Sequence, residues 1–287
     1  MTRIALIRSG LALLGILLLA GCGGDDSADQ YFQEIDKQEA KDAETTKQTG
    51  SAEPEVVLPE IPLEPEPREL DGVPPPKLAG IRELRETYSD DTPRVVRRVK
   101  FYTDDSTVNH GNYTEWHPNG QKSCEGEYSD GKRGGVWTYW FEDGKKAKSG
   151  RYKDGKPSGN WTYWRPDGTK DREESYRDGK RHGRSIFYNE KGKPKQQGEY
   201  NDGLRHGTWT RWFDSGQKAA EGHYVNGKLH GTQTVWFENG KIGHQAEFVN
   251  GKRDGKIVTW NEAGEKVSEL IYDNDVLLKR KIGSGTD

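Results

Sequence analysis

From residue 110 to residue 277, apolar and polar positions repeat every 24 residues, seven times and without a gap. Each unit holds two short runs rich in Thr and aromatic residues, separated by Asp-Gly or Asn-Gly pairs such as Asn119-Gly120 and Asp130-Gly131. Such runs favour strands, and such pairs supply the positive φ angles of tight hairpin turns. Because neither turn leaves room for a crossover helix, the pattern predicts an all-β fold, an elongated single-layer antiparallel meander of tandem β-hairpin repeats.

Several positions are constant within this one chain. Positions 2 and 11 of the unit are Gly in all seven units, and position 19 is Tyr in every unit except the sixth, which has Phe248. Position 7 is Tyr188 in the fourth unit and a tryptophan in the other six, namely Trp116, Trp140, Trp164, Trp212, Trp236 and Trp260. Equivalent positions recur on every second strand, about 10 Å apart. We therefore predict that these six tryptophans form a binding surface.

Units of the form Tyr-x-Asp-Gly-Lys-x-x-Gly-x-Trp, as at residues 152–161, resemble the MORN-repeat variant of bacterial proteins, some of which are regarded as antitoxins. The resemblance spans residues 110–277 and implies a single elongated, twisted sheet. It is informative about fold and says little about function, because such arrays serve many roles.

Two units depart from the pattern, and both ends of the array should be atypical. In the fourth unit Ser185 replaces the aromatic residue of position 4, and in the sixth Gln233 does so. We expect these units to be less well packed. Residues 92–109 are predicted to add a capping strand before the first unit, and residues 278–287 to form a C-terminal tail.

The N-terminus predicts a lipoprotein signal peptide over residues 1–21. Arg3 and Arg8 flank a short apolar run that ends at Gly21-Cys22, which resembles a bacterial lipobox. In such signals cleavage between Gly21 and Cys22 leaves an acylated cysteine, and each buried CH₂ contributes about 0.8 kcal/mol to membrane binding. We expect a lipid anchor at Cys22 in the cell membrane or outer membrane, with the repeats facing the periplasm or exterior. An ordinary secretory signal or an uncleaved anchor is the alternative.

Residues 22–91 are predicted to be a disordered, acidic, Pro-rich linker. Eight of the thirteen prolines fall in residues 54–76, and residues 25–91 carry 19 acidic and 7 basic side chains. Proline restricts φ and like charges repel, so this stretch should be extended. Residues 92–287 carry 28 acidic and 35 basic side chains, so the two parts have opposite net charge.

No pattern in the chain predicts catalysis, a metal site or a cofactor. The position-1 histidines would lie about 10 Å apart along the sheet, too far to share a zinc ion; they are His110, His182, His206 and His230. Cys124 is expected to be a partly buried strand residue, because nothing in a flat sheet orients a base toward it. We therefore predict a protein that is not an enzyme.

The predicted function is a lipid-anchored interaction scaffold at the cell envelope with an unknown protein partner. One alternative is an antitoxin-like protein that neutralises a toxin, which the family resemblance alone implies. Another is binding of cell-wall glycan, since rows of aromatic rings suit flat sugar faces. Nucleic acid is not an expected partner, because an exported protein rarely meets it and the basic excess of the repeats is modest.

Overall fold

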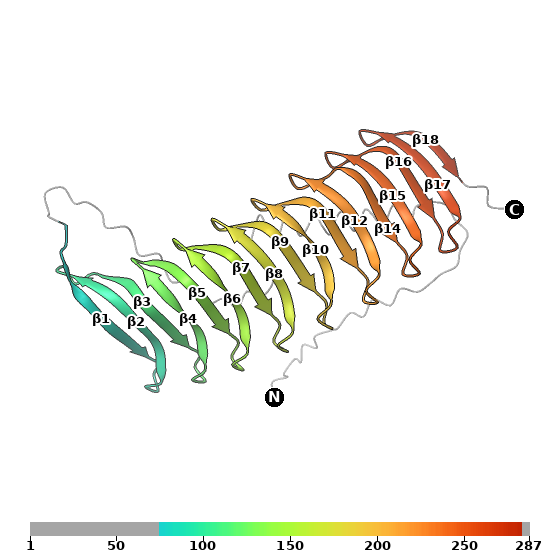
Figure 1. Cartoon of the computed structure of the whole chain (residues 1–287). Coiled ribbons are helices and arrows are strands. Elements are labelled where there is room, and N and C mark those ends of the chain that lie inside the picture. The colour runs from blue at the N-terminus through green and yellow to red at the C-terminus, as the bar shows by residue number, and fades with distance from the viewer. Residues whose placement is uncertain (1–74, 283–287) are drawn as a thin grey trace, which may run out of the picture. The chain divides into compact units, whose positions relative to one another are not determined.

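The computed structural model describes residues 75–282, which form one open antiparallel sheet (Figure 1). Its strands follow in chain order as β1 (Leu78–Thr87), β2 (Pro93–Tyr102), β3 (Thr107–Trp116), β4 (Lys122–Ser129), β5 (Lys132–Trp140), β6 (Lys146–Lys153), β7 (Lys156–Trp164), β8 (Lys170–Arg177), β9 (Lys180–Tyr188), β10 (Pro194–Asn201), β11 (Leu204–Trp212), β12 (Lys218–Val225), β13 (Lys228–Leu229), β14 (Gly231–Trp236), β15 (Ile242–Val249), β16 (Lys252–Trp260), β17 (Lys266–Asp273) and β18 (Val276–Ile282).

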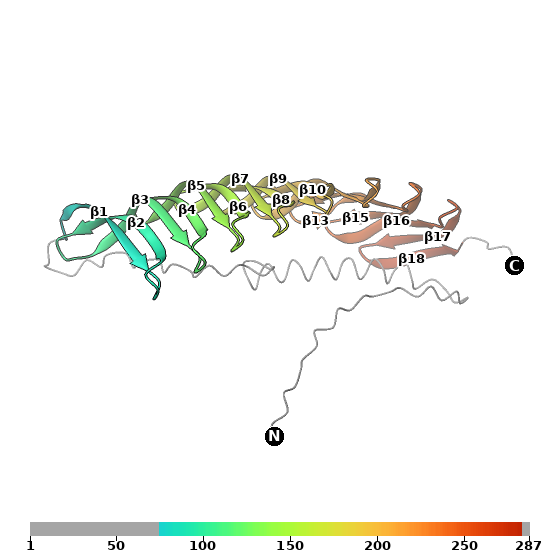
Figure 2. The same ribbon diagram turned by 90° about the horizontal axis from the view of Figure 1, so that it is seen from below.

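Neighbouring strands in the chain are neighbours in the sheet. β1 pairs with β2, β2 with β3, and so on to β17 and β18, always antiparallel. The strand after β12 is broken at His230 into β13 and β14, which both pair with β12. Figure 2 shows this sheet as a single layer. The predicted all-β meander is confirmed, and within residues 75–282 no helix is long and apolar enough to cross a membrane.

The ends of the array differ from the expected boundaries. The linker was expected to reach residue 91, but β1 occupies Leu78–Thr87 inside that range. The expected tail from residue 278 begins within β18, which runs to Ile282. β1 was missed because it carries neither the Gly positions nor the Asp-Gly turns of the 24-residue unit. Gly21, Cys22 and the rest of residues 1–74 lie outside the described part of the chain.

The two turns of each unit use glycine differently. At the second turn both central residues have positive φ, as at Asp130 (48°) and Gly131 (78°), which is the type I′ geometry that matches strand twist. At the first turn only the Gly is positive, as at Gly120 (82°), whose N–H donates to the His117 carbonyl. Asn119 instead accepts a hydrogen bond from the Gln121 N–H. The expectation of two positive φ residues therefore holds for one of the two turns.

One face of the sheet is packed, and we call it the core face. Position-4 rings lie directly over position-17 glycines of the preceding strand, so that a Cβ added to Gly126 would lie 2.3 Å from Trp137. Trp137 is 0% exposed, and its indole N–H donates to the Glu127 carbonyl. Position-19 tyrosines such as Tyr128 pack edge-on against these rings at 5.1 Å between centroids. A single layer thus buries its core by covering backbone with rings.

The fourth unit exchanges this packing for a polar one. Glu174 replaces the position-17 glycine, and Ser185, paired with it across the strands, replaces the ring. Both are buried, at 4% and 0% exposure. The Glu174 carboxylate accepts a hydrogen bond from Tyr176 (2.8 Å) and lies 3.5 and 3.6 Å from Arg172 and Arg181. Ser185 is therefore buried without a ring, and its buried hydroxyl has no hydrogen-bond partner among the described residues, so looser packing of this unit stays a prediction.

Candidate binding face

The position-7 rings lie on the face opposite the core. Side chains alternate along a strand, so Trp140 points away from the face that buries Tyr139 and Trp137. All position-7 rings are partly exposed. We call this surface the ladder face and define it by Trp116, Trp140, Trp164, Tyr188, Trp212, Trp236 and Trp260. The structure therefore brings the six predicted tryptophans onto one surface, one from each of six hairpins.

Lysines alternate with these rings. Each ring stands opposite position 13 of the following strand, as Trp116 does opposite Lys122. The Lys122 ammonium then lies 5.8 Å from the ring centroid of Trp140 in the next hairpin, within cation–π range. The same contact joins Lys146 to Trp164 at 6.0 Å and Lys218 to Trp236 at 5.8 Å. Rings and lysines therefore alternate along the ladder, except at Pro194 and Ile242, which occupy position 13 in the fourth and sixth units.

A second row beside the rings alternates in charge. Position 16 is opposite the position-5 residue on both neighbouring strands, as Glu125 is opposite Thr114 and Thr138. In odd-numbered units it is a glutamate that pairs with the position-13 lysine, and the pairs are Lys122–Glu125, Lys170–Glu173, Lys218–Glu221 and Lys266–Glu269. In even-numbered units it is neutral, as Ser149, Gln197 or Gln245. Carboxylates therefore recur at every second hairpin.

The lysines act on the carboxylates that they contact. The hydrogen bond from Lys170 holds the pKa of Glu173 below its usual value, and the hydrogen bond from Lys266 does the same to Glu269. Both carboxylates are therefore ionised at neutral pH, and each is held in place on the ladder face by its lysine.

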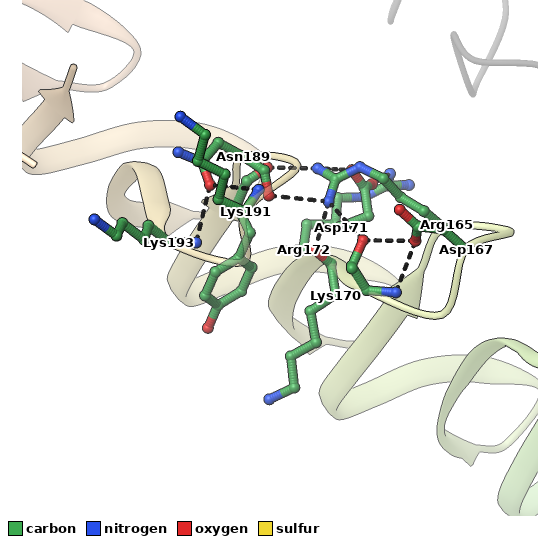
Figure 3. Close-up of polar contacts among 10 residues, drawn as sticks. Arg165, Asp167, Lys170, Asp171, Arg172, Asn189, Lys191 and Lys193 are labelled. Atoms are coloured by element: carbon green, nitrogen blue, oxygen red, sulfur yellow. Dashed lines mark hydrogen bonds and ion pairs between the residues drawn. The ribbon is translucent and has the colours of Figure 1, made fainter. Parts of the chain in front are cut away.

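Hydrogen bonds link some of the turns that directly follow the position-7 rings. Figure 3 shows Arg165, in the turn after β7, reaching the next such turn at Asn189. Arg165 donates to the carbonyls of Lys170 (2.7 Å) and Asn189 (3.3 Å) and pairs with Asp171 (2.9 Å). In the first unit His117 bridges in the same way to the Trp140 carbonyl at 3.0 Å. These bridges fix the spacing between neighbouring rings.

The other candidate chemistry is dispersed. Cys124 lies on the core face at 3% exposure, where burial, followed by nearby Glu115, raises the pKa of its thiol. His110 and His182 face different aspartates, Asp130 (3.2 Å) and Asp202 (3.5 Å), three hairpins apart. Within residues 75–282 no group of three His, Cys, Asp or Glu side chains is placed to hold a metal ion.

The lysines of the ladder were missed by reasoning on the sequence, although a signal was present. Position 13 is Lys in five of the seven units, at Lys122, Lys146, Lys170, Lys218 and Lys266. The sequence does not show the strand register, which is needed to see that Lys122, Lys146 and Lys218 each reach the ring of the next hairpin.

The geometry defines a tandem β-hairpin repeat protein with one packed face and one partly open face. Five segments match the family described as the MORN repeat variant, at residues 109–130, 133–154, 181–202, 205–226 and 229–250. Five segments of the chain are therefore similar to the MORN repeat variant. Position 17 is Glu174 in the third unit and Leu270 in the seventh, the two units outside these matches.

Among curated proteins no relative matches the chain. Among solved structures, one similar chain is that of an S. aureus TarM mutant in complex with fondaparinux, alpha-GlcNAc-glycerol and UDP, with 16% identity and a TM-score of 0.15. Another is a crystal structure of TarM, with 17% identity and a TM-score of 0.14. The matches cover 52% and 53% of this chain and 21% of each of those chains.

Proposed function

We propose that the chain is a lipid-anchored, non-catalytic scaffold of the bacterial cell envelope, and that its ladder face binds a partner protein. The observation that carries the proposal is the register of that face, where each hairpin of the array contributes one partly exposed ring and five of the seven hairpins contribute a position-13 lysine. Protein interfaces favour aromatic residues surrounded by polar groups, and rigid rings supply contact area at low entropic cost. A binding role also agrees with the MORN-type repeats.

A protein partner fits the ladder face better than a glycan does. Sugars stack on open ring faces, whereas the rings of Trp140, Trp164 and Trp236 each have a lysine ammonium over one face. Fixed carboxylates at every second hairpin offer charge complementarity, which gives specificity to protein interfaces. The partner expected from this face presents acidic and basic groups along an extended surface.

The binding test compares the two faces of the same hairpins. We expect Trp140→Ala and Trp212→Ala to lower the affinity for the partner at least tenfold while the sheet stays folded by circular dichroism. Trp209→Phe is the matched control, since it perturbs the core face of the hairpin that carries Trp212. The partner is captured from detergent-solubilised envelopes by the full chain and then measured with purified components. Equal losses in the control and the ladder variants would show that the rings act only through stability.

The identity of the captured partner separates the remaining alternatives. A single toxin bound at the ladder face would make the chain an antitoxin-like neutraliser instead of a scaffold. Sedimentation of the full chain with purified peptidoglycan, lost on Trp140→Ala, would favour glycan binding in place of a protein partner.

The anchor is tested separately. We expect radiolabelled palmitate to enter the wild-type chain and not Cys22→Ala, and globomycin to cause accumulation of the unprocessed precursor. Lack of label in the wild type, or equal label in both chains, would refute the anchor and leave the binding proposal intact.

A further inference from the structure

β1 is an edge strand whose outer side has no partner among the described residues, since it pairs only with β2. Unpaired edges present rows of backbone N–H and C=O groups, and proteins usually cover, charge or pair them. Much of the β1 side-chain surface is also open: Leu78 is 54% and Ile81 47% exposed. Such an edge requires either protection or a partner.

The charges of β1 are complementary to themselves in reverse order. Its centre is Arg82-Glu83-Leu84-Arg85-Glu86. If a second copy of the strand runs antiparallel with Leu84 at the two-fold axis, Glu83 faces Arg85 of the second copy and Arg82 faces Glu86 of the second copy. Symmetry makes each pair occur twice, so four opposite-charge pairs flank a Leu–Leu contact. Opposite charges directly across strands stabilise a pair, and like charges destabilise it.

Two of the four charged side chains at this centre, Glu83 and Arg85, are well exposed, and the other two contact β2. Arg85 is 75% and Glu83 45% exposed, and within one chain they contact each other at 2.8 Å on the same side of the strand. Arg82 is held over the Phe101 ring at 4.8 Å, and Glu86 lies 3.4 Å from Arg97 on β2. Contacts to β2 therefore hold Arg82 and Glu86, while Glu83 and Arg85 remain exposed.

The opposite edge has a different design. β18 pairs only with β17 among the described residues and carries the consecutive basic residues Lys279, Arg280 and Lys281. Antiparallel pairing of β18 with itself about Arg280 would place like charges face to face. Charge repulsion therefore disfavours self-pairing of β18, whereas the charges of β1 favour it.

We propose that two copies of the chain pair through β1, antiparallel and two-fold symmetric about Leu84, to form one continuous sheet. An isologous contact of this kind closes and does not grow into a fibre. One strand pair buries less than a standard interface, so we expect a dissociation constant on the order of 1–100 µM.

The test is a charge exchange at the two most exposed positions. Sedimentation velocity of the full chain in mild detergent should show a monomer–dimer equilibrium for the wild type. Glu83→Arg and Arg85→Glu each place like charges opposite one another, so each alone should weaken the dimer roughly tenfold or more. Mixing the two variants restores opposite charges at both pairs and should restore dimers. Glu127→Arg, an exposed charge reversal on the interior strand β4, should sediment as the wild type does.

Three results would overturn the proposal. One is a wild-type chain that stays monomeric at hundreds of micromolar, and another is a pair of variants whose mixture gains no dimer. The third is a mass that keeps growing with concentration, which would indicate head-to-tail contact between β1 and β18. Circular dichroism of each variant, expected to match the wild type, ensures that a lost dimer is not a lost fold.

Discussion

Trp161 and Trp164 lie three residues apart in β7 and point to opposite faces of the sheet. Trp161 is 2% exposed and covers Gly150 so closely that an added Cβ would lie 2.1 Å from its ring. Trp164 is partly exposed and contacts the Lys146 ammonium. A tryptophan is therefore a core residue at position 4 and a partly exposed surface residue at position 7.

We expect the two tryptophans to differ in their contribution to stability. Trp161→Ala should lower the free energy of unfolding by about 3–5 kcal/mol, since it uncovers backbone and leaves a cavity. Trp164→Ala should cost roughly 1–2 kcal/mol, because its ring is only partly buried. Urea unfolding followed by circular dichroism measures both. A Trp164→Ala cost as large as that of Trp161→Ala would mean that the ladder ring belongs to the core.

His244 makes the stability of the sixth unit depend on pH. It is 7% exposed on the core face, and burial lowers its pKa to about 4 from the usual 6.5. The folded state therefore favours the neutral ring. That contribution is fully present above about pH 6.5 and is lost as the pH falls through about 4.

The matched variant for this effect is His244→Ala, which copies Ala220 at the same position of the preceding unit. We expect the difference in unfolding free energy between wild type and variant to shrink or reverse between pH 6.5 and 4. Urea titrations at several pH values measure it. A difference that stays constant across this window would contradict the assigned pKa.

Each hairpin completes its core packing only together with the strand that precedes it. A position-4 ring packs on the position-17 residue of the preceding unit, so the two positions are coupled. Gly126, Gly150 and Gly198 meet tryptophans, whereas Glu174 meets Ser185. The missing ring at Ser185 in the fourth unit therefore goes together with the missing glycine at Glu174, its partner on the neighbouring strand.

This coupling predicts a double-mutant cycle. Ser185→Trp alone should be strongly destabilising, because the ring would meet the Glu174 side chain. Glu174→Gly alone should also be destabilising, because it leaves Arg172 and Arg181 without the carboxylate that they face. The double variant recreates the pair found in other units, so it should be more stable than either single variant by at least about 1 kcal/mol. Strictly additive costs in urea unfolding would refute the coupling.

Most of the strands and turns could be predicted from the sequence, and particular residues show why. Asp130 and Gly131 form a type I′ turn, and Asp-Gly is one of the pairs that favour this turn most strongly. The strand register was not predictable, because positive-φ glycines such as Gly135 lie where the register shifts in alternate strands. Without the register, neither the ring that covers Gly126 nor the lysine over Trp140 could be assigned.

At the scale of the whole sheet, contacts are local and repetitive. Each hairpin touches the hairpins beside it, so stability is expected to be a sum of unit and neighbour terms. The aromatic contacts run from Tyr113 through Tyr176, give way to the polar pair at Ser185, and resume from Tyr200 to Tyr224. Two surfaces result, a core face whose rings are largely buried and a ladder face whose rings are partly exposed.

The most direct test of the ladder face uses adjacent residues that point to opposite sides. A photo-crosslinking amino acid is placed in the full chain at Thr162 on the ladder face or at Tyr163 on the core face, and cells of the native host are irradiated. We predict that the partner is crosslinked from Thr162 and not from Tyr163, with the same partner crosslinked from Thr210, two units further along. Crosslinks from Tyr163 alone, equal crosslinks from both faces, or none from Thr162 and Thr210 would contradict the account.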